Sequence, residues 1–337
     1  MKVLITGAGG FIGSHLVDSQ LAQGHQVRAA DLNLDRLLHV RGNPRLQEAT
    51  GDIAEADFLG QLVEGVDVVY HLASAHLDVS QGDATYHRVN VAATRQLLVA
   101  AQAAGVQRFV HCSSNGVLGE IETLPADETT ACHPTNIYEQ TKLLGEQAAL
   151  AFAAETGFHV VVARPAWVYG PRCPRTARLL RMVGRGRFLM FGNGRTLRHP
   201  LYVADAVRGL ELCATAGAPG EIYFLAGEKA VTLNELLQTI AAAMQVQLRI
   251  IRLPLALGIV AGHVVQAAFR PLGLHPPISR RTIDFFIKDN AYRTEKAQRD
   301  LGFRAQTDLR SGILKTLALA AEVSPPVPAE LRTISGR

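Results

Sequence analysis

The sequence predicts an α/β fold in which helices cover both faces of a doubly wound parallel sheet, with a smaller second unit. A glycine-rich turn directly follows the first apolar run, and short β-branched runs then alternate with longer helical stretches. Parallel neighbours need crossover connections, which such helices supply. The chain has 337 residues, 48% of them hydrophobic, so it can bury a large core in about two structural units.

The first half of the chain carries the alternation. The predicted strands share β-branched and apolar residues, and they are 2–6, 26–31, 66–73, 108–114 and 159–164. The predicted helices between them are 13–22, 84–104 and 136–156.

The pattern changes after Pro165, where residues 168–196 are rich in Gly, Pro and Arg. Later segments predict a strand running into a helix at 201–213, a short strand at 223–226 and a helix at 232–244. Thr232 and Glu235 form a capping box at the start of that last helix. We therefore expect a first unit of residues 1–165 that also receives about 197–226. The second unit comprises 166–196 and 227–322, before a loose Pro-rich tail at 323–337.

Composition excludes several classes of protein. Lys and Arg exceed Asp and Glu by 34 − 30 = 4, too mild a balance for a nucleic-acid-binding protein. Four cysteines without CxxC or His-rich spacing predict neither a disulfide framework nor a metal site. The N-terminus enters a strand without a signal-peptide layout, and the longest apolar run, 253–269, is about 17 residues against the ~20 needed to cross a bilayer. These features predict a soluble, cytoplasmic protein.

Thr6-Gly-Ala-Gly-Gly-Phe-Ile-Gly13 lies between the first strand and the first helix. Gly7 makes the tight turn, Gly10 lets the backbone approach a pyrophosphate, and Gly13 lets the helix pack on the strand. Asp31 ends the second strand, where a carboxylate accepts hydrogen bonds from ribose hydroxyls and repels a 2′-phosphate. The first unit is therefore predicted to bind NAD in preference to NADP.

Tyr138 and Lys142 lie four residues apart on a predicted helix, and hence on one face. A nearby cation favours the phenolate form of a tyrosine, so this pair can act as a base near neutral pH. Ser113 and Ser114 end another strand, where active sites of α/β folds form. A serine hydroxyl there can hold a substrate oxygen beside Tyr138.

These motifs resemble those of the extended short-chain dehydrogenase/reductases, in the NAD-dependent epimerase/dehydratase group, over nearly the whole chain. The matching segments are TGAGGFIG (6–13), Asp31, GDI (51–53), HLA (71–73), Asn90, CSSNGVLG (112–119), YEQTK (138–142), RPAWVYGP (164–171), HPLYVADAV (199–207) and KAQRDLGF (296–303).

The resemblance implies a Rossmann-type homodimer whose catalytic residues are Ser114, Tyr138, Lys142 and Asn90. Tyr138 is then the base, Lys142 its partner and a ribose ligand, Ser114 the group that orients substrate, and Asn90 a structural or relay residue. The implied cofactor-binding residues are Gly7, Gly10, Phe11, Ile12, Gly13, Asp31, Asp52, Ile53, Leu72, Ala73, Ser113, Tyr138, Lys142 and Pro165.

One departure from the family pattern concerns the residues after Ser114. The nucleotide-sugar 4,6-dehydratases carry an Asp-Glu pair there, whereas this chain has Asn115 and Gly116. No carboxylic acid is then present to protonate a leaving hydroxyl group, so we do not expect a 4,6-dehydratase.

The substrate region carries two conflicting signals. Residues 156–204 contain no Asp or Glu but nine arginines, which suits an anionic substrate. By resemblance to sugar-nucleotide epimerases, Arg198 would bind a diphosphate and Arg281 would assist it, with Asn115 and His199 as further substrate contacts. Against this, 253–274 is strongly apolar, and the C-terminal segment resembles 3β-hydroxysteroid and sterol dehydrogenases. The alternative interpretations are a solvated arginine face and a core helix.

We expect an NAD-dependent oxidoreductase or epimerase that moves hydride at a secondary alcohol carbon. A nucleotide-diphosphosugar substrate is favoured over a lipophilic 3β-hydroxysteroid-type alcohol. Membrane contact is not favoured, and a non-catalytic NAD-binding sensor is the remote alternative, because Ser114, Tyr138 and Lys142 are all present.

Overall fold

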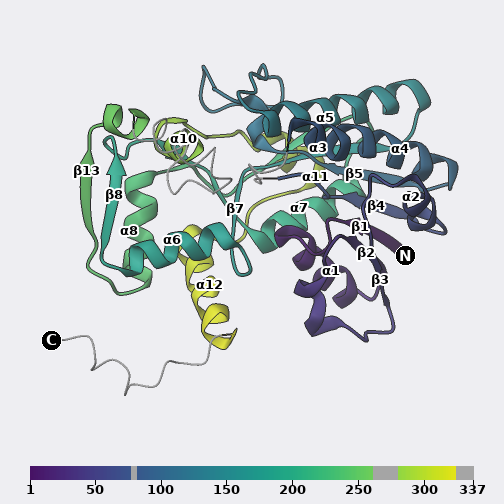
Figure 1. Cartoon of the computed structure of the whole chain (residues 1–337), viewed down its shortest axis with the longest axis horizontal. Helices are drawn as coiled ribbons and strands as arrows, with labels where there is room; N and C mark the ends of the chain where they lie inside the picture. The colour runs from purple at the N-terminus through teal and green to yellow at the C-terminus, as the bar shows by residue number, and fades with distance from the viewer. Residues whose placement is uncertain (77–81, 261–279, 324–337) are drawn as a thin grey trace.

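A seven-stranded parallel sheet forms the centre of the first unit, in the order β11-β6-β5-β4-β1-β2-β3 (Figure 1). The structure is a computed structural model that describes residues 1–76, 82–260 and 280–323. The strands are β1 Lys2–Thr6, β2 Gln26–Asp31, β3 Leu46–Thr50, β4 Val68–His71, β5 Arg108–Cys112, β6 Val160–Pro165 and β11 Ile222–Leu225. The strand order changes direction between β1 and β4, which is where α/β sheets open a crevice for ligands.

Helices cover both faces of this sheet, as the sequence predicts (Figure 1). Helices α1 (Phe11–Ala22) and α7 (Val203–Ala216) lie on one face; α2 (Ala56–Val63), α4 (Ala93–Ala103) and α5 (Ile137–Thr156) lie on the other. Alternate residues of β1 enter the two cores: Val3 and Ile5 pack on the α1 side, and Leu4 packs on the α2 side. A strand buried on both faces needs apolar residues throughout, which explains the continuous run in the sequence.

Several predicted bounds agree with the structure and others differ. β1 and β2 match the predicted strands, whereas β4 and β5 are shorter than 66–73 and 108–114. β3 was not predicted, because this edge strand, LQEAT, has half-buried or exposed side chains throughout and no apolar run. The predicted helix at 84–104 is divided into α3 (Asp83–His87), a π-helical turn η2 (Arg88–Ala92) and α4.

The second unit packs against the carboxyl ends of the central strands. Its elements are α6 Pro174–Gly184, β8 Arg187–Phe191, β9 Leu197–Arg198, β12 Val231–Thr232, α8 Leu233–Ala243, β13 Arg249–Leu253, α10 Arg280–Ile287 and α12 Leu309–Val323. The predicted capping box of α8 is confirmed, since Thr232 Oγ1 accepts from Glu235 N while the Glu235 carboxylate accepts from Thr232 N. Between the units, β7 (Trp167–Tyr169) pairs with β10 (Pro200–Tyr202).

Two predicted segments fall largely outside the described residues: the apolar stretch 253–274 beyond position 260, and the tail 323–337 beyond position 323. In the described ranges, no helix combines the length and the hydropathy needed to span a bilayer.

Candidate active site

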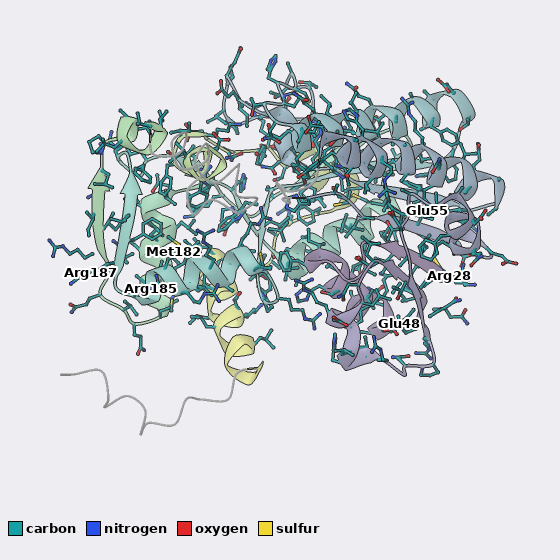
Figure 2. All side chains as sticks on the ribbon, viewed as in Figure 1. Arg28, Glu48, Glu55, Met182, Arg185 and Arg187 are labelled. Carbon is teal, nitrogen blue, oxygen red and sulfur yellow. The ribbon has the colours of Figure 1, made fainter. Side chains whose placement is uncertain are left out.

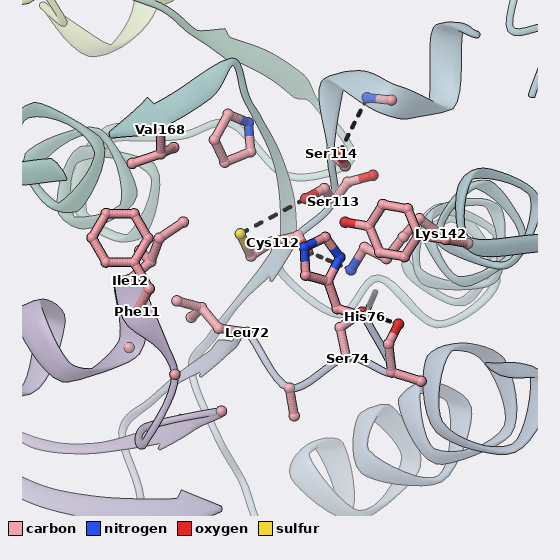
Figure 3. Close-up of a pocket in the computed structure, with 18 of the residues that line it drawn as sticks. Phe11, Ile12, Leu72, Ser74, His76, Cys112, Ser113, Ser114, Lys142 and Val168 are labelled. Carbon is pink, nitrogen blue, oxygen red and sulfur yellow. Dashed lines mark hydrogen bonds between the residues drawn. The ribbon is translucent and has the colours of Figure 1, made fainter. Parts of the chain in front are cut away.

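A cavity of about 790 Å³ opens at the carboxyl ends of β1, β2, β4 and β5, at the point where the strand order changes direction. Figure 3 shows its middle part, where the strand ends meet α5. All the predicted site residues whose side chains the structure describes line it, except Asn90 and His199. The cavity therefore brings together the glycine turn, Asp31, the serines and the Tyr138–Lys142 pair.

The glycine turn is packed so tightly that larger residues would not fit. Gly7 adopts a positive φ of 72°, and a Cβ there would lie 2.6 Å from the backbone nitrogen of Ala73. A Cβ at Gly13 would lie 2.0 Å from the carbonyl oxygen of Gly7. The first turn of α1 has no acidic residue and no side-chain cap, so its backbone N–H groups and the helix dipole face the cavity unneutralised. This arrangement suits the pyrophosphate of a dinucleotide.

Asp31, at the end of β2, lines the part of the cavity next to the glycine turn. Its Oδ2 accepts a hydrogen bond from Gly9 N at 2.9 Å, which fixes the carboxylate beside the turn. Arg28 is not available to a 2′-phosphate, because it is buried and its guanidinium donates to Gln47 and to backbone carbonyls near the end of α2. Arg36 lines the cavity and donates to the carbonyl oxygen of Gly9.

Helix α5 presents Tyr138 and Lys142 one turn apart. Lys142 is 4% exposed, and its Nζ donates to the carbonyl oxygen of Cys112 at 2.6 Å. Burial lowers the pKa of Lys142. Burial also lowers the pKa of His71 to about 3, with Lys142 adding to the effect, so this neighbouring imidazole is neutral. Lys142 thus lies on the same face of α5 as Tyr138, close to a neutral imidazole.

The two serines at the end of β5 have different partners. Ser114 Oγ accepts from Gly116 N at 3.1 Å, which leaves its hydroxyl hydrogen able to bind a substrate oxygen in the cavity. Ser113 Oγ instead donates to Glu146 at 2.6 Å (Figure 3 shows both serines). Glu146 is buried one turn beyond Lys142 and forms an ion pair with Arg164 of β6, whose Nε donates to the same carboxylate at 3.0 Å. This buried pair joins α5 to the ends of β5 and β6.

Asn90 lies outside the cavity, within the π turn η2. Its side chain is 2% exposed and holds the loop after β4: Oδ1 accepts from Ala75 N and from Ser74 Oγ, while Nδ2 donates to the carbonyl oxygen of Ala75. Nδ2 also donates to Thr141 Oγ1 on α5 at 3.0 Å. The Asn90 side chain therefore connects the loop to α5.

Asn115 lines the cavity, and its Nδ2 donates to Tyr292 Oη at 2.5 Å. His199, predicted to touch substrate, lies behind this layer: Nδ1 accepts from Tyr292 N, and Nε2 bonds to the carbonyl oxygen of Gly227. Both ring nitrogens of this buried histidine thus support the protein framework.

Arg198 lines the cavity, but its guanidinium is engaged elsewhere. Its two terminal nitrogens donate to four backbone carbonyls, those of Leu197, Asp284, Phe285 and Lys288. The guanidinium also lies over the Phe285 ring at 4.7 Å. Burial lowers the pKa of Arg198 to about 10. Its N–H groups therefore bond to the C-terminal turn of α10 and are not available for bidentate binding of a diphosphate.

The rest of the arginine stretch is mostly remote from the cavity. Of its nine arginines, all of them described, Arg175 and Arg198 are cavity-lining residues. Figure 2 shows Arg185 and Arg187 at the far end of the second unit, pointing outward. The backbone of Arg281 belongs to α10, but its side chain lies outside the described part of the structure.

Some cavity residues were not predicted: His76, Glu139, Trp167, Val168, Asp284, Phe285, Lys288 and Asn290. Trp167 and Val168 lie within the RPAWVYGP segment, so their position after a strand could have indicated them. Glu139 lies within YEQTK, and His76 follows the HLA segment closely. Asp284, Phe285, Lys288 and Asn290 carry no local motif, because they lie in or after α10, which reaches the cavity through tertiary packing.

Comparison with known proteins gives concordant results. The family model for the NAD dependent epimerase/dehydratase family matches residues 3–226. A dTDP-glucose 4,6-dehydratase of Streptomyces griseus is 33% identical, covering 94% of this chain and 93% of that protein. A 3 beta-hydroxysteroid dehydrogenase/Delta 5-->4-isomerase of Mycobacterium tuberculosis is 30% identical, covering 90% and 85%. The crystal structure of a DesIV double mutant, a dTDP-glucose 4,6-dehydratase from Streptomyces venezuelae with NAD and DAU bound, is 27% identical, with a TM-score of 0.78 over 96% of this chain and 97% of that one.

Proposed function

The chain is an NAD-dependent enzyme of the NAD dependent epimerase/dehydratase family, and we propose that it interconverts a secondary alcohol and a ketone on a largely apolar substrate. The main observation behind this proposal is that the Arg198 guanidinium donates to four backbone carbonyls. Arg198 was the main support for a nucleotide-sugar substrate, and these bonds occupy its donors. Trp167, Val168 and Phe285 supply apolar surface to the cavity instead. Apolar walls with a few polar groups are typical of sites for small lipophilic molecules.

The proposed chemistry uses three side chains. NAD supplies the hydride acceptor for oxidation when bound, and its reduced form supplies the donor for reduction. In oxidation, the Tyr138 phenolate takes the proton of the substrate hydroxyl as the carbonyl forms. Ser114 donates its hydroxyl hydrogen to the substrate oxygen and holds it beside Tyr138. The buried Lys142 ammonium favours the phenolate form of Tyr138.

Elimination of water is not part of this proposal. Asn115 follows Ser114, and its amide donates to Tyr292, so this position offers no acid to a leaving hydroxyl group. Glu139 also lines the cavity, but its carboxylate accepts from both the backbone nitrogen and the hydroxyl of Thr135 at the start of α5. That carboxylate is committed to the helix terminus.

A nucleotide-diphosphosugar remains the second candidate substrate. Arg175 and Lys288 line the cavity, and cations at such positions can bind phosphate oxygens. With this substrate, the same three residues would support epimerisation through a transient ketone.

A thermal-shift screen of the NAD-loaded protein separates the two candidates. We expect 3β-hydroxysteroids or other lipophilic secondary alcohols to raise the melting temperature. At a hundredfold excess over its Kd, a ligand increases the free energy of unfolding by about 2.7 kcal/mol. UDP, dTDP and GDP sugars form the second panel, with Arg175→Gln as the variant that should abolish their binding and leave that of steroids unchanged. Stabilisation by one sugar class alone, lost in Arg175→Gln, would refute the apolar substrate.

Ligands that pass this screen are then tested for turnover. NADH absorbance should report oxidation by the wild type and not by Tyr138→Phe. Appearance of the epimeric alcohol without net formation of NADH would instead indicate epimerisation.

A further inference from the structure

His76, in the loop that follows β4, lies against the proposed catalytic base. Its ring centroid is 4.5 Å from that of Tyr138, and the two planes meet at 62°, an edge-to-face contact. Figure 3 shows His76 reaching from the side of Ser74 toward Lys142 and the two serines. We propose that His76 is a positioning residue for Tyr138, and that the charge of its imidazole is coupled to ionisation of the phenol. The inference rests on the proposed role of Tyr138 as the base.

The loop carrying His76 is fixed by direct hydrogen bonds. Asn90 binds both backbone polar groups of Ala75, the residue before His76, and its amide also donates to Thr141 on α5. Thr141 lies three residues after Tyr138 on the same helix. The loop therefore contacts α5 at two successive points, through Asn90 and through the His76 ring, so the ring contact belongs to an anchored segment.

The contact restricts the orientation of the Tyr138 ring. Edge-to-face packing of aromatic rings contributes about 0.5–1.5 kcal/mol beyond burial. Tyr138 is half-buried, and the His76 ring adds an aromatic contact to its packing. The contact with His76 therefore limits the positions open to the Tyr138 ring in the cavity that Ser114 also lines.

His76 also differs chemically from the histidines beneath the site. It is exposed to solvent and lines the cavity, so water can exchange protons with its ring. A free imidazole titrates near 6.5. His71 and His111 are fully buried, and burial with the nearby Lys142 charge lowers the pKa of both, which keeps them neutral.

Charged or titratable groups from three elements line the same cavity as Tyr138. Lys142 and Glu139 lie on α5, Cys112 ends β5, and Asp284 and Lys288 lie in and directly after α10. Lys288 lies near the Glu139 carboxylate at 3.8 Å, and burial raises the pKa of the Cys112 thiol. His76 adds an imidazole to this set. Two unit charges 4.5 Å apart in a watery site shift each other's pKa by about half a unit or more.

The coupling can be measured without any substrate. Proton NMR of the NAD-loaded protein gives the apparent pKa of the His76 ring, assigned by its loss in His76→Phe. In Tyr138→Phe, which cannot form a phenolate, this pKa should fall by about half a unit. The tyrosinate absorbance assigned to Tyr138 should shift to higher pH by a similar amount in His76→Phe, because the coupling is reciprocal. Independent titrations of the two groups would overturn the coupling.

Kinetics then test the positioning role. His76→Ala should lower kcat about tenfold with little change in KM for NAD, because the phenol loses this contact. His76→Phe keeps a ring at this position and should recover most of the rate while losing one titration from the pH profile. His25 is a half-buried histidine beside the N-terminus, so His25→Phe is the control variant and should behave as wild type. A His76→Ala enzyme with wild-type kcat would refute positioning. Failure of the substrate panels would leave the NMR result valid, so the two proposals fail separately.

Discussion

Removal of the charge on Glu146 should cost both stability and activity, because this carboxylate is the only described carboxylate paired with the buried Arg164 guanidinium. The two side chains are 2% and 3% exposed. The Glu146 carboxylate accepts from two nitrogens of Arg164 and from Ser113 Oγ. Glu146→Gln leaves an uncompensated buried cation, and breaking such a pair costs about 3–5 kcal/mol.

The expected shift in melting temperature follows from the length of the chain. With about 2.1 cal/mol/K of unfolding entropy per residue, 337 residues give roughly 0.7 kcal/mol/K. A loss of 3–5 kcal/mol then lowers the melting temperature by about 4–7 °C. Because the pair joins α5 to the end of β5, kcat should fall as well, through the placement of Ser114 relative to Tyr138.

The assay is thermal unfolding of Glu146→Gln, Arg164→Met and the double variant, followed by circular dichroism. Removing both charges leaves no unpaired ion, so the double variant should be more stable than either single variant. NAD affinity measured by calorimetry checks that the nucleotide side of the cavity is intact. A double variant whose loss equals the sum of the two single losses would show that the pair acts independently and would refute the reasoning.

Three other perturbations give separate tests. Tyr138→Phe should abolish turnover with nearly unchanged NAD affinity, since the phenol serves the chemistry; a large loss of NAD binding in calorimetry would contradict this. Asp31→Ala should relax the preference against NADP, and a wild type that binds NADP as well as NAD would show that this carboxylate does not select the cofactor. Burial holds the pKa of His71 at about 3 and that of His111 well below 6.5, so the unfolded chain binds more protons than the folded one below pH 6.5. Stability should therefore fall as the pH drops from 6.5 toward 3, and His111→Leu should flatten that slope in urea titrations.

The sheet could be predicted because most of its strands are buried on both faces and therefore carry continuous apolar runs. The edge strand β3 could not, since its exposed positions hold Gln47 and Glu48. The π turn also escaped prediction, because its residues, RVNVA, differ in no obvious way from those of an α-helix. The predicted homodimer and cytoplasmic location stay predictions.

The site was predictable where its residues follow a strand directly. The glycine turn and Ser114 belong to such segments, and Tyr138 and Lys142 share one helix face. Arg198 shows the limit of this reasoning. Its charge and position suggested an anion site, but in the structure its guanidinium donates to carbonyls at the end of α10. Contacts of that kind arise from how the second unit packs, and no local pattern records them.

The π turn η2 contains one more residue per turn than the α-helices on either side of it, in effect an insertion retained within a helix. Each residue of an α-helix turns the following side chains by about 100°. Deleting a single neighbour such as Val91 would restore regular winding and carry Asn90 away from the loop before His76 or from its partner on α5. A one-residue deletion could therefore disable the site without altering any side chain that lines it. The number of residues in this helix is thus constrained as well as their identity.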